Sequence, residues 1–191
     1  MCATLLWVGA ALAQAADRFI DNGDGTLSDT KTGLMWEKKT PAGTGGWHDV
    51  DNRYTWTDDP VRVLPDGGAF KKFLGHLNGA KSNDGVTVTG CFANHCDWRL
   101  PGIDELKEIV DPNAPGCIPF FNGPESTGAC IDSKFGPTQF DRDAWYWTAT
   151  TNGDRDTGGV FAWVVHFGDA EARNNGSKVR NSYVRAVRRG P

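Results

Sequence analysis

The chain has 191 residues, including 24 glycines, 10 prolines and 8 tryptophans, and its formal net charge is −4. This length fits one domain with a sizeable core, and the composition argues against a helical bundle and favours a loop-rich fold. No motif of a nucleic-acid-binding module is present, so we expect no nucleic acid among the partners.

The N-terminal segment has the pattern of a secretory signal peptide. It is apolar and uncharged up to Asp17, and Ala13-Gln14-Ala15 supplies the small residues that a signal peptidase requires. Its apolar run is too short to span a bilayer. We therefore predict a signal peptide over 1–15 and one domain over 16–191 without a transmembrane span. The alternative is a buried first strand or helix. The predicted location is secreted, either extracellular, at the cell surface or in the periplasm.

The segment "DNGDGT", residues 21–26, lies between two short predicted strands and resembles a calcium loop. An EF-hand loop needs Asp or Asn at positions one, three and five and glycine at position six, and no register of this segment meets that requirement. Asn, Asp and Gly tolerate positive φ, which suits a tight hairpin turn. We interpret the segment as a hairpin, with an irregular calcium site formed by Asp21, Asp24 and Asp29 as the alternative.

After a strand expected at 34–37 and an irregular segment at 40–68, two short helices follow. The run "AFKKFLGHLN", residues 69–78, is predicted to be an amphipathic helix, because four apolar residues recur at helical spacing (Phe70, Phe73, Leu74 and Leu77). Asp104 and Glu105 favour the first turn of a second helix, whose apolar face is formed by Leu106, Ile109 and Val110.

The last third of the chain is predicted to form β-strands. The segments 145–151 and 160–167 alternate between apolar and polar residues, and a strand at 182–189 is expected to close the chain. In the second of these segments the alternation predicts one apolar face, formed by Phe161, Trp163, Val165 and Phe167. His166 is then expected at the surface. Two short helices, an antiparallel sheet and long loops indicate an α+β domain.

Four cysteines remain after removal of the predicted signal peptide. An even number in an exported chain indicates two disulfides, for which three pairings are possible. We favour Cys91–Cys96 and Cys117–Cys130, because pairing between sequence neighbours closes two short loops. His95 between the first two cysteines leaves a metal site as the alternative, although a second ligand pair at zinc-site spacing is missing.

The basic residues are unevenly distributed. Residues 173–191 contain six basic side chains and no acidic one, whereas the rest of the chain is acidic. Such a segment either meets an anionic polymer or pairs with the protein's own acidic surface. The six are Arg173, Lys178, Arg180, Arg185, Arg188 and Arg189.

Five blocks of sequence occur in the order and spacing of one known family. They are "DNGDGTLSDTKTGLMWEK", "WRLPGIDELKEIVD", "YWTATT", "AWVVHFGDA" and "YVRAVRR". Together they resemble the C-terminal domain of bacterial collagen-like adhesins, the Lcl C-terminal-like family, over nearly the whole mature chain. The resemblance implies a C-type-lectin-like fold related to formylglycine-generating enzymes. It also implies export, binding of sulfated glycans such as glycosaminoglycans, and a homo-oligomer such as a trimer.

We therefore expect a noncatalytic, adhesin-like module that binds an anionic or sulfated polysaccharide. Lys and Arg suit sulfate groups through charge-assisted hydrogen bonds, and sugar rings stack on exposed indoles. The candidate contacts are Trp47, Trp56, Lys178, Arg180, Arg188 and Arg189. The other tryptophans of the mature chain lie in the regular blocks and are expected in the core (Trp36, Trp98, Trp145, Trp147 and Trp163).

Two other classes of function are possible for such a chain. One is a structural subunit of an extracellular assembly or filament. The other is an enzyme of the formylglycine-generating type, which needs a reactive cysteine pair near the C-terminal part of the domain. The last cysteine is Cys130, and none lies in the predicted terminal strands, so we expect no catalytic residues. We also expect no cofactor, apart from the calcium alternative.

Overall fold

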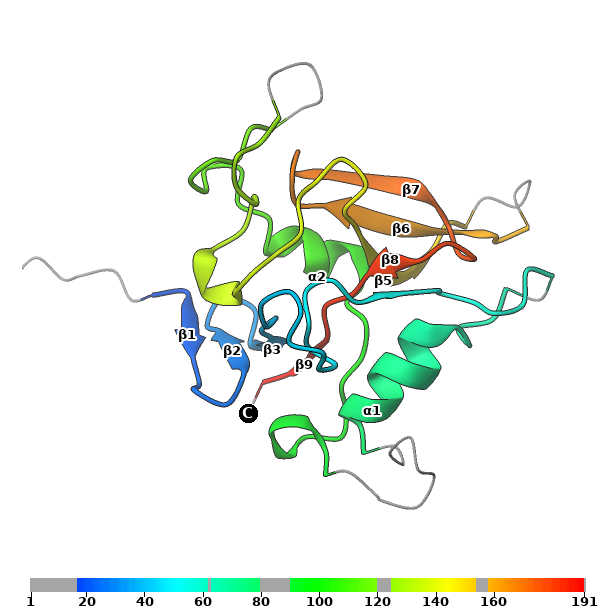
Figure 1. The fold of residues 1–191 in the computed structure, drawn as a ribbon, viewed down its shortest axis with the longest axis horizontal. Helices are drawn as coiled ribbons and strands as arrows, with labels where there is room; N and C mark the ends of the chain where they lie inside the picture. Colours follow the sequence, from blue (N-terminus) through cyan, green and yellow to red (C-terminus); the bar gives the residue numbers. More distant parts are fainter. Residues whose placement is uncertain (1–16, 62, 80–89, 120–124, 154–157, 191) are drawn as a thin grey trace, which may run out of the picture.

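A computed structural model describes residues 17–61, 63–79, 90–119, 125–153 and 158–190 (Figure 1). These residues form two β-sheets with helices packed on them, which confirms the predicted α+β class. The predicted signal peptide lies outside the described residues. Within the described ranges, no helix has the length and apolar character that crossing a bilayer requires.

The first sheet joins the two ends of the domain. Its order is β1 (Phe19–Asp21), β2 (Thr26–Asp29), β3 (Leu34–Glu37) and β9 (Val187–Arg189), and each neighbouring pair is antiparallel. Figure 1 shows β9 at the end of the chain beside β3, on the side away from the blue β1–β2 hairpin. The last strand of the domain therefore completes the sheet that the N-terminal strands begin.

The hairpin prediction for residues 21–26 is confirmed. The turn between β1 and β2 contains Gly23 at φ 79° and Gly25 at φ 89°, in the left-handed region that residues with a Cβ rarely adopt. Asp21 Oδ1 accepts a hydrogen bond from the Gly23 amide at 3.0 Å, and Asp24 Oδ1 accepts one from the Thr26 amide at 3.1 Å. These two hydrogen bonds, each between residues two positions apart, fix the turn.

The second sheet has five strands in the order β4, β8, β5, β6 and β7. Their bounds are β4 Arg53–Tyr54, β5 Trp145–Thr151, β6 Phe161–His166, β7 Glu171–Ser177 and β8 Ser182–Tyr183. The sheet is mixed, and not purely antiparallel as the sequence predicts, because β5 and β8 run parallel where Tyr146 faces Tyr183.

Both predicted helices are present. The first is a π-helical segment, η1 (Ala69–Leu74), that continues into α1 (Gly75–Leu77), and the second is α2 (Ile103–Glu108). Two single 3₁₀ turns, η2 (Phe92–Asn94) and η3 (Ser133–Phe135), lie in the loops. Phe73, Leu74 and Leu77 are buried, as the helical spacing predicts.

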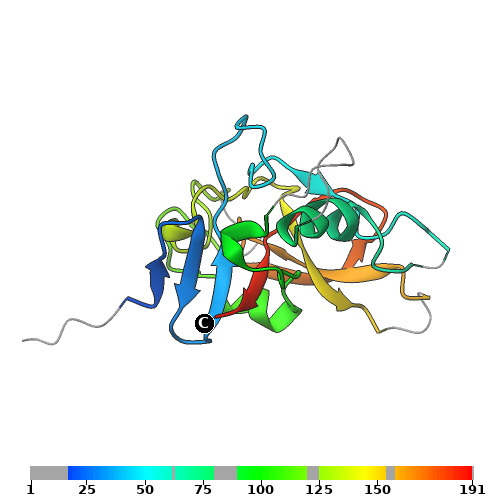
Figure 2. The same cartoon turned by 90° about the horizontal axis from the view of Figure 1, so that it is seen from below.

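The two helices cover opposite faces of the five-stranded sheet, as the turned view shows (Figure 2). Neighbouring residues in a strand point to opposite faces. In β5, Trp147 belongs to the same buried cluster as Phe73 of η1, whereas Tyr146 belongs to the cluster of Leu106 in α2. The central strands are consequently buried on both sides.

This double coverage corrects the prediction for residues 160–167. Ala162, Val164 and Val165 are all buried, so the strand has no single apolar face. His166 is 3% exposed and not a surface residue. Its Nδ1 lies 2.8 Å from Asp169 Oδ1, and its Nε2 lies 2.7 Å from the Asp141 carbonyl oxygen.

The core tryptophans follow the prediction in part. Trp36, Trp98 and Trp147 are buried, but Trp145 and Trp163 are only partly buried. The predicted closing strand at 182–189 is also corrected, because it divides into β8 and β9. The buried residues 184–186 between them carry the chain from one sheet to the other.

The favoured disulfide pairing is confirmed. Cys91 is bonded to Cys96, and Cys117 is bonded to Cys130, so the metal alternative for these cysteines is excluded. The Cys91–Cys96 loop follows residues 80–89, and the Cys117–Cys130 loop includes residues 120–124; both of these segments lie outside the described ranges.

We predict that each disulfide contributes to stability in proportion to the logarithm of its loop length. Replacing Cys117 and Cys130 with Ala, which opens a loop with a sequence separation of 13, should cost about 3 kcal/mol in unfolding free energy. Opening the Cys91–Cys96 loop, with a separation of 5, should cost about 2 kcal/mol. Denaturant titration of the two double variants measures both values, and unchanged midpoints would contradict the assigned role.

Candidate functional site

The structure brings two of the predicted contact residues, Trp56 and Lys178, together in one open pocket. The pocket has a volume of about 570 Å³ and lies where β5 ends, beside η1. The described residues that line it are Trp56, Val63, Pro65, Phe70, Ala149, Thr151, Gly158, Gly159 and Lys178. Residues far apart in the sequence thus form one site.

Main-chain hydrogen bonds hold the two residues next to each other. The amides of Trp56 and Thr57 donate to the Lys178 carbonyl at 2.9 and 3.1 Å, and the Lys178 amide donates to the Val160 carbonyl at 3.1 Å. Gly67 lets η1 begin directly against this segment, because a Cβ at this position would lie 2.5 Å from the Thr55 carbonyl oxygen. The site is therefore built on rigid backbone.

The side chains place an ammonium over an indole. Lys178 Nζ lies 3.9 Å from the centroid of the Trp56 ring and donates to Thr151 Oγ1 at 3.0 Å. Trp56 is itself fixed, because its Nε1 donates to the Thr148 carbonyl at 3.0 Å and Phe70 packs edge-on at a centroid distance of 5.0 Å. An ammonium over an aromatic face gains a cation–π attraction.

Lys178 is a buried cation without a carboxylate partner among the described residues. It is 2% exposed, and burial lowers its pKa from the ordinary lysine value, with no acidic neighbour to offset the effect. In the loop that follows Trp56, Asp58 and Asp66 both pair with Lys71, at 3.6 and 3.3 Å. An isolated buried charge is costly, so an anion entering the pocket would relieve a real energetic cost.

Trp56 differs from the exposed stacking platform that the sequence predicts. It is 4% exposed, because the segment 55–57 runs between Lys178 and η1, so its ring forms a wall of the pocket and not a surface plate. Trp47 is partly exposed and stacks on His76 of α1 at a centroid distance of 4.5 Å. The two tryptophans therefore contact opposite ends of the same helical segment.

The predicted basic residues do not form one patch. Arg188 Nε donates to Asp97 Oδ1 at 2.6 Å, so this arginine pairs within the protein. Arg180 and Arg189 are exposed, and neither has a carboxylate partner among the described residues, but Arg180 follows β7 and Arg189 lies in β9 of the other sheet. The basic C-terminal segment consists mainly of structural contacts.

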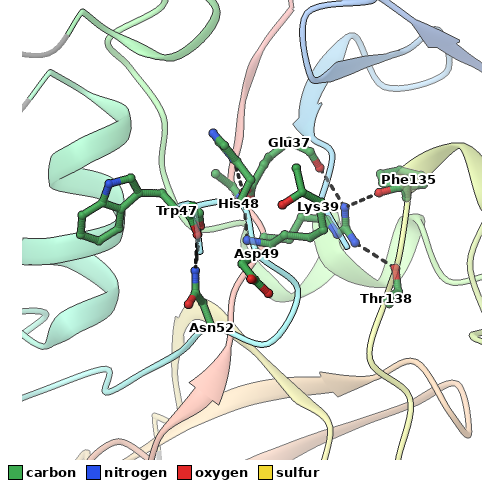
Figure 3. Close-up of polar contacts among 12 residues, drawn as sticks. Glu37, Lys39, Trp47, His48, Asp49, Asn52, Phe135 and Thr138 are labelled. Carbon is green, nitrogen blue, oxygen red and sulfur yellow. Dashed lines mark hydrogen bonds and ion pairs between the residues drawn. The ribbon is translucent and has the colours of Figure 1, made fainter. Parts of the chain in front are cut away.

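A buried charge cluster next to the Trp47 loop was not found from the sequence (Figure 3). Glu37 Oε1 accepts a hydrogen bond from Lys39 Nζ at 2.8 Å and lies 2.7 Å from His48 Nδ1, and Glu37 Oε2 accepts from the Ala186 amide at 2.9 Å. Arg185, which is 0% exposed, completes the cluster. Among the described residues, the buried polar side-chain atoms of this cluster have internal partners except Arg185 Nε, and the cluster acts as a structural element.

Arg185 ties three segments together through its guanidinium. It donates to the carbonyl oxygens of Glu37 and Phe135 at 2.8 and 3.1 Å and to Thr138 Oγ1 at 2.9 Å. Burial of Glu37 would raise its pKa, but the charges of Lys39 and His48 lower it to about 2. Burial lowers the pKa of Lys39, an effect that Glu37 opposes. The carboxylate is therefore ionised across the physiological range.

The three candidate calcium ligands are already engaged within the protein. Asp21 pairs with Lys38, Asp24 Oδ1 accepts from Thr26 Oγ1 at 2.6 Å, and the buried Asp29 pairs with Arg18 at 2.7 Å. Among the residues with described positions, no group of three or more His, Cys, Asp or Glu is placed to hold a metal ion. The calcium site stays a prediction that these contacts do not support.

Sequence reasoning missed Phe70 and Thr151 as pocket residues. Phe70 was assigned to the apolar face of the helix, and Thr151 is an ordinary polar residue at a strand end. No predicted element contained Lys178, so the sequence offered no signal that would bring Thr151 and Lys178 close.

Comparisons with known proteins give one match. A family model described as the Lcl C-terminal domain matches residues 25–188, which include both disulfides, the Glu37 cluster and the pocket. No curated protein and no solved structure matches the chain.

We predict that Glu37→Gln strongly destabilises the protein. The change leaves Lys39 buried without its counter-charge, and removing one member of a buried ion pair costs about 3–5 kcal/mol. Denaturant titration measures this loss. The matched control is Lys31→Met, which removes the exposed Lys31–Glu108 pair and should change stability by less than about 1 kcal/mol.

The same carboxylate predicts how stability depends on pH. The folded-state pKa of Glu37, about 2, lies below its ordinary value of 4.5, so its contribution is present above pH 4.5 and is lost as the pH falls towards 2. The unfolding midpoint should therefore decrease over this interval, and the decrease should be smaller in Glu37→Gln. An identical acid profile in both proteins would contradict the assignment.

Proposed function

Because the chain belongs to the Lcl C-terminal domain family, we propose that it is a noncatalytic, adhesin-like module of the extracellular space or cell surface that binds an anionic polysaccharide. The two disulfides are consistent with an oxidising compartment. The anionic ligand is the finer part of the proposal and rests on the pocket.

The observation that carries the proposal is the ammonium of Lys178 in that pocket. It is buried, lacks a carboxylate partner among the described residues, and lies against Trp56 and near Phe70. Aromatic rings contact the C–H faces of sugars, and a desolvated ammonium forms charge-assisted hydrogen bonds with an anion. These are the two groups that recognition of an acidic sugar requires.

The cysteines support the absence of catalysis of the formylglycine-generating type. All four cysteines in the described part of the chain are bonded in disulfides, so none of them offers a free thiol. The carboxylate of Glu37 is engaged by internal partners, Lys39 and the Ala186 amide.

A structural subunit of an extracellular assembly is the second candidate. The observation that favours it is the exposure of apolar side chains close to the pocket in sequence: Val61 is 85% exposed, Leu64 52% and Val179 48%. Such residues suit contact with another chain. In that case an oligomer would form in solution, and the trimer that the family resemblance implies would be one form of it.

We predict that the protein binds acidic glycans on an array of acidic, sulfated and neutral sugars, and that Lys178→Met weakens this binding about tenfold or more, the usual value of a charged hydrogen bond. Exposed Lys72, which has no carboxylate partner among the described residues, provides the matched control Lys72→Met, which should bind like the native protein. Lys178→Met should not lower the unfolding midpoint, since removing an unpaired buried charge relieves its desolvation cost.

The array is measured at low and high salt, with and without calcium. The binding proposal would be overturned in favour of the structural subunit if no acidic glycan binds and sedimentation experiments show a concentration-dependent oligomer. Calcium-dependent binding would restore the candidate site at Asp21, Asp24 and Asp29.

A further inference from the structure

We infer that the Lys178 pocket selects sugars that carry a single carboxylate, of the uronic-acid class, over densely sulfated chains. This inference rests on the proposed function, because it names the class of anion that the same pocket takes. Four properties of the pocket lead to it: its charge, its hydrogen-bond donors, its aromatic wall and its surroundings.

The pocket offers one charge to a ligand. Of the described residues that line it, Lys178 alone is ionised, and the wall is otherwise formed mainly by apolar side chains such as Val63, Pro65 and Phe70. One ammonium neutralises one anion. A second sulfate on the same sugar would lie against an apolar wall without a counter-charge, which is costly.

The free hydrogen-bond donors match a carboxylate. An ammonium has three N–H donors, and Lys178 uses one of them on Thr151 Oγ1 at 3.0 Å. The remaining two can serve the two oxygens of a carboxylate. A sulfate ester presents three terminal oxygens, and the indole N–H of Trp56 is not available for the third because it donates to the Thr148 carbonyl.

The aromatic wall sets the distance between the anion and the sugar ring. Lys178 Nζ lies 3.9 Å from the Trp56 ring centroid, so an anion bound to it must stay beside the indole. The carboxylate of a uronic acid is attached directly to a ring carbon, which allows the sugar face to contact Trp56 or Phe70 at the same time. A sulfate is held one ester oxygen further from its ring.

The lysines and arginines near the pocket residues in sequence differ in whether they are paired within the described part of the chain. Lys71, on the neighbouring turn of η1, is shared between Asp58 and Asp66. Two exposed cations without a carboxylate partner among the described residues follow pocket residues in the sequence: Arg180, two residues after Lys178, and Lys72, two residues after Phe70. A densely sulfated chain would need a second cation, for which Arg180 is the candidate next to Lys178 in sequence, whereas a single carboxylate would not. Arg180 therefore separates the two classes of ligand experimentally.

The experiment uses one polysaccharide in three forms. A heparin-type chain carries both carboxylates and sulfates, and it can be desulfated or carboxyl-reduced without changing its backbone. Binding of each form to the full-length mature protein is measured by calorimetry. We expect the desulfated form to retain binding. The carboxyl-reduced form should lose at least about tenfold in affinity, because it lacks the partner of Lys178.

Two variants locate the effect. Lys178→Met should weaken binding of the desulfated form by a similar factor, whereas Arg180→Gln should change it less than about twofold, as expected for a residue outside the contact. Equal unfolding midpoints establish that both variants are folded. If desulfated binding is unaffected by Lys178→Met, the pocket is not the site and the inference is overturned.

The remaining outcomes separate this inference from the proposed function. Binding that follows the sulfates and requires both Lys178 and Arg180 would overturn the carboxylate selectivity and leave the anionic-polysaccharide proposal standing. If none of the three forms binds, and uronic-acid polymers on the array do not bind either, both the carboxylate selectivity and the anionic-polysaccharide proposal are overturned.

Discussion

The two sheets of this domain are held together by the carboxylate of Glu37. Glu37 ends β3 in the first sheet, and its Oε2 accepts from the amide of Ala186, in the segment that carries the chain from β8 in the second sheet to β9 in the first. The main chain repeats the connection, because the Glu37 amide donates to the Ala186 carbonyl at 3.0 Å. The ionised side chain thus lies at the junction on which both sheets depend.

A buried carboxylate at this junction requires buried cations, and the surrounding loops are arranged to supply them. Lys39 and His48 bind its Oε1, and Arg185 binds the Glu37 carbonyl from the other side. Lys39 is also 4.5 Å from the Phe73 ring centroid, which connects the cluster to η1. The helix that carries the wall of the pocket is therefore fixed by the same cluster that joins the sheets.

Local patterns in the sequence were sufficient for the N-terminal hairpin turn, the two helices and the disulfides. The turn at 21–26 depends on glycines at positive φ, and η1 and α2 depend on apolar spacing within one segment, so each could be predicted without its neighbours. The Cys91–Cys96 and Cys117–Cys130 pairs also join residues close in sequence. These features are determined over short distances along the chain.

The features that were mispredicted depend on contacts between distant segments. His166 alternates away from the apolar residues of its strand, but the opposite face is covered as well, so it becomes buried beside Asp169. Residues 184–186 continue the strand pattern on both sides, yet the chain changes sheets there. Arg185 belongs to a basic segment that suggests a surface, and its partners Glu37 and Phe135 are 148 and 50 residues away. No local pattern contains such information.

The difference between Lys178 and the other buried cations is what distinguishes a site from a scaffold in this protein. Lys39 and Arg185 are desolvated too, but Lys39 pairs with Glu37 and Arg185 Nη1 donates to two backbone carbonyls, so their burial contributes to the fold. The partners of Lys178 are an indole and a hydroxyl. They offset the desolvation cost of its ammonium less than a carboxylate partner would. Natural sequences often retain such a cost where function requires it. The basic charge of the C-terminal segment left open whether it meets an anionic polymer or pairs within the protein. Arg173, Arg185 and Arg188 pair within the protein. Of the cations of this segment without a carboxylate partner among the described residues, Lys178 is the one that is buried and lines the pocket.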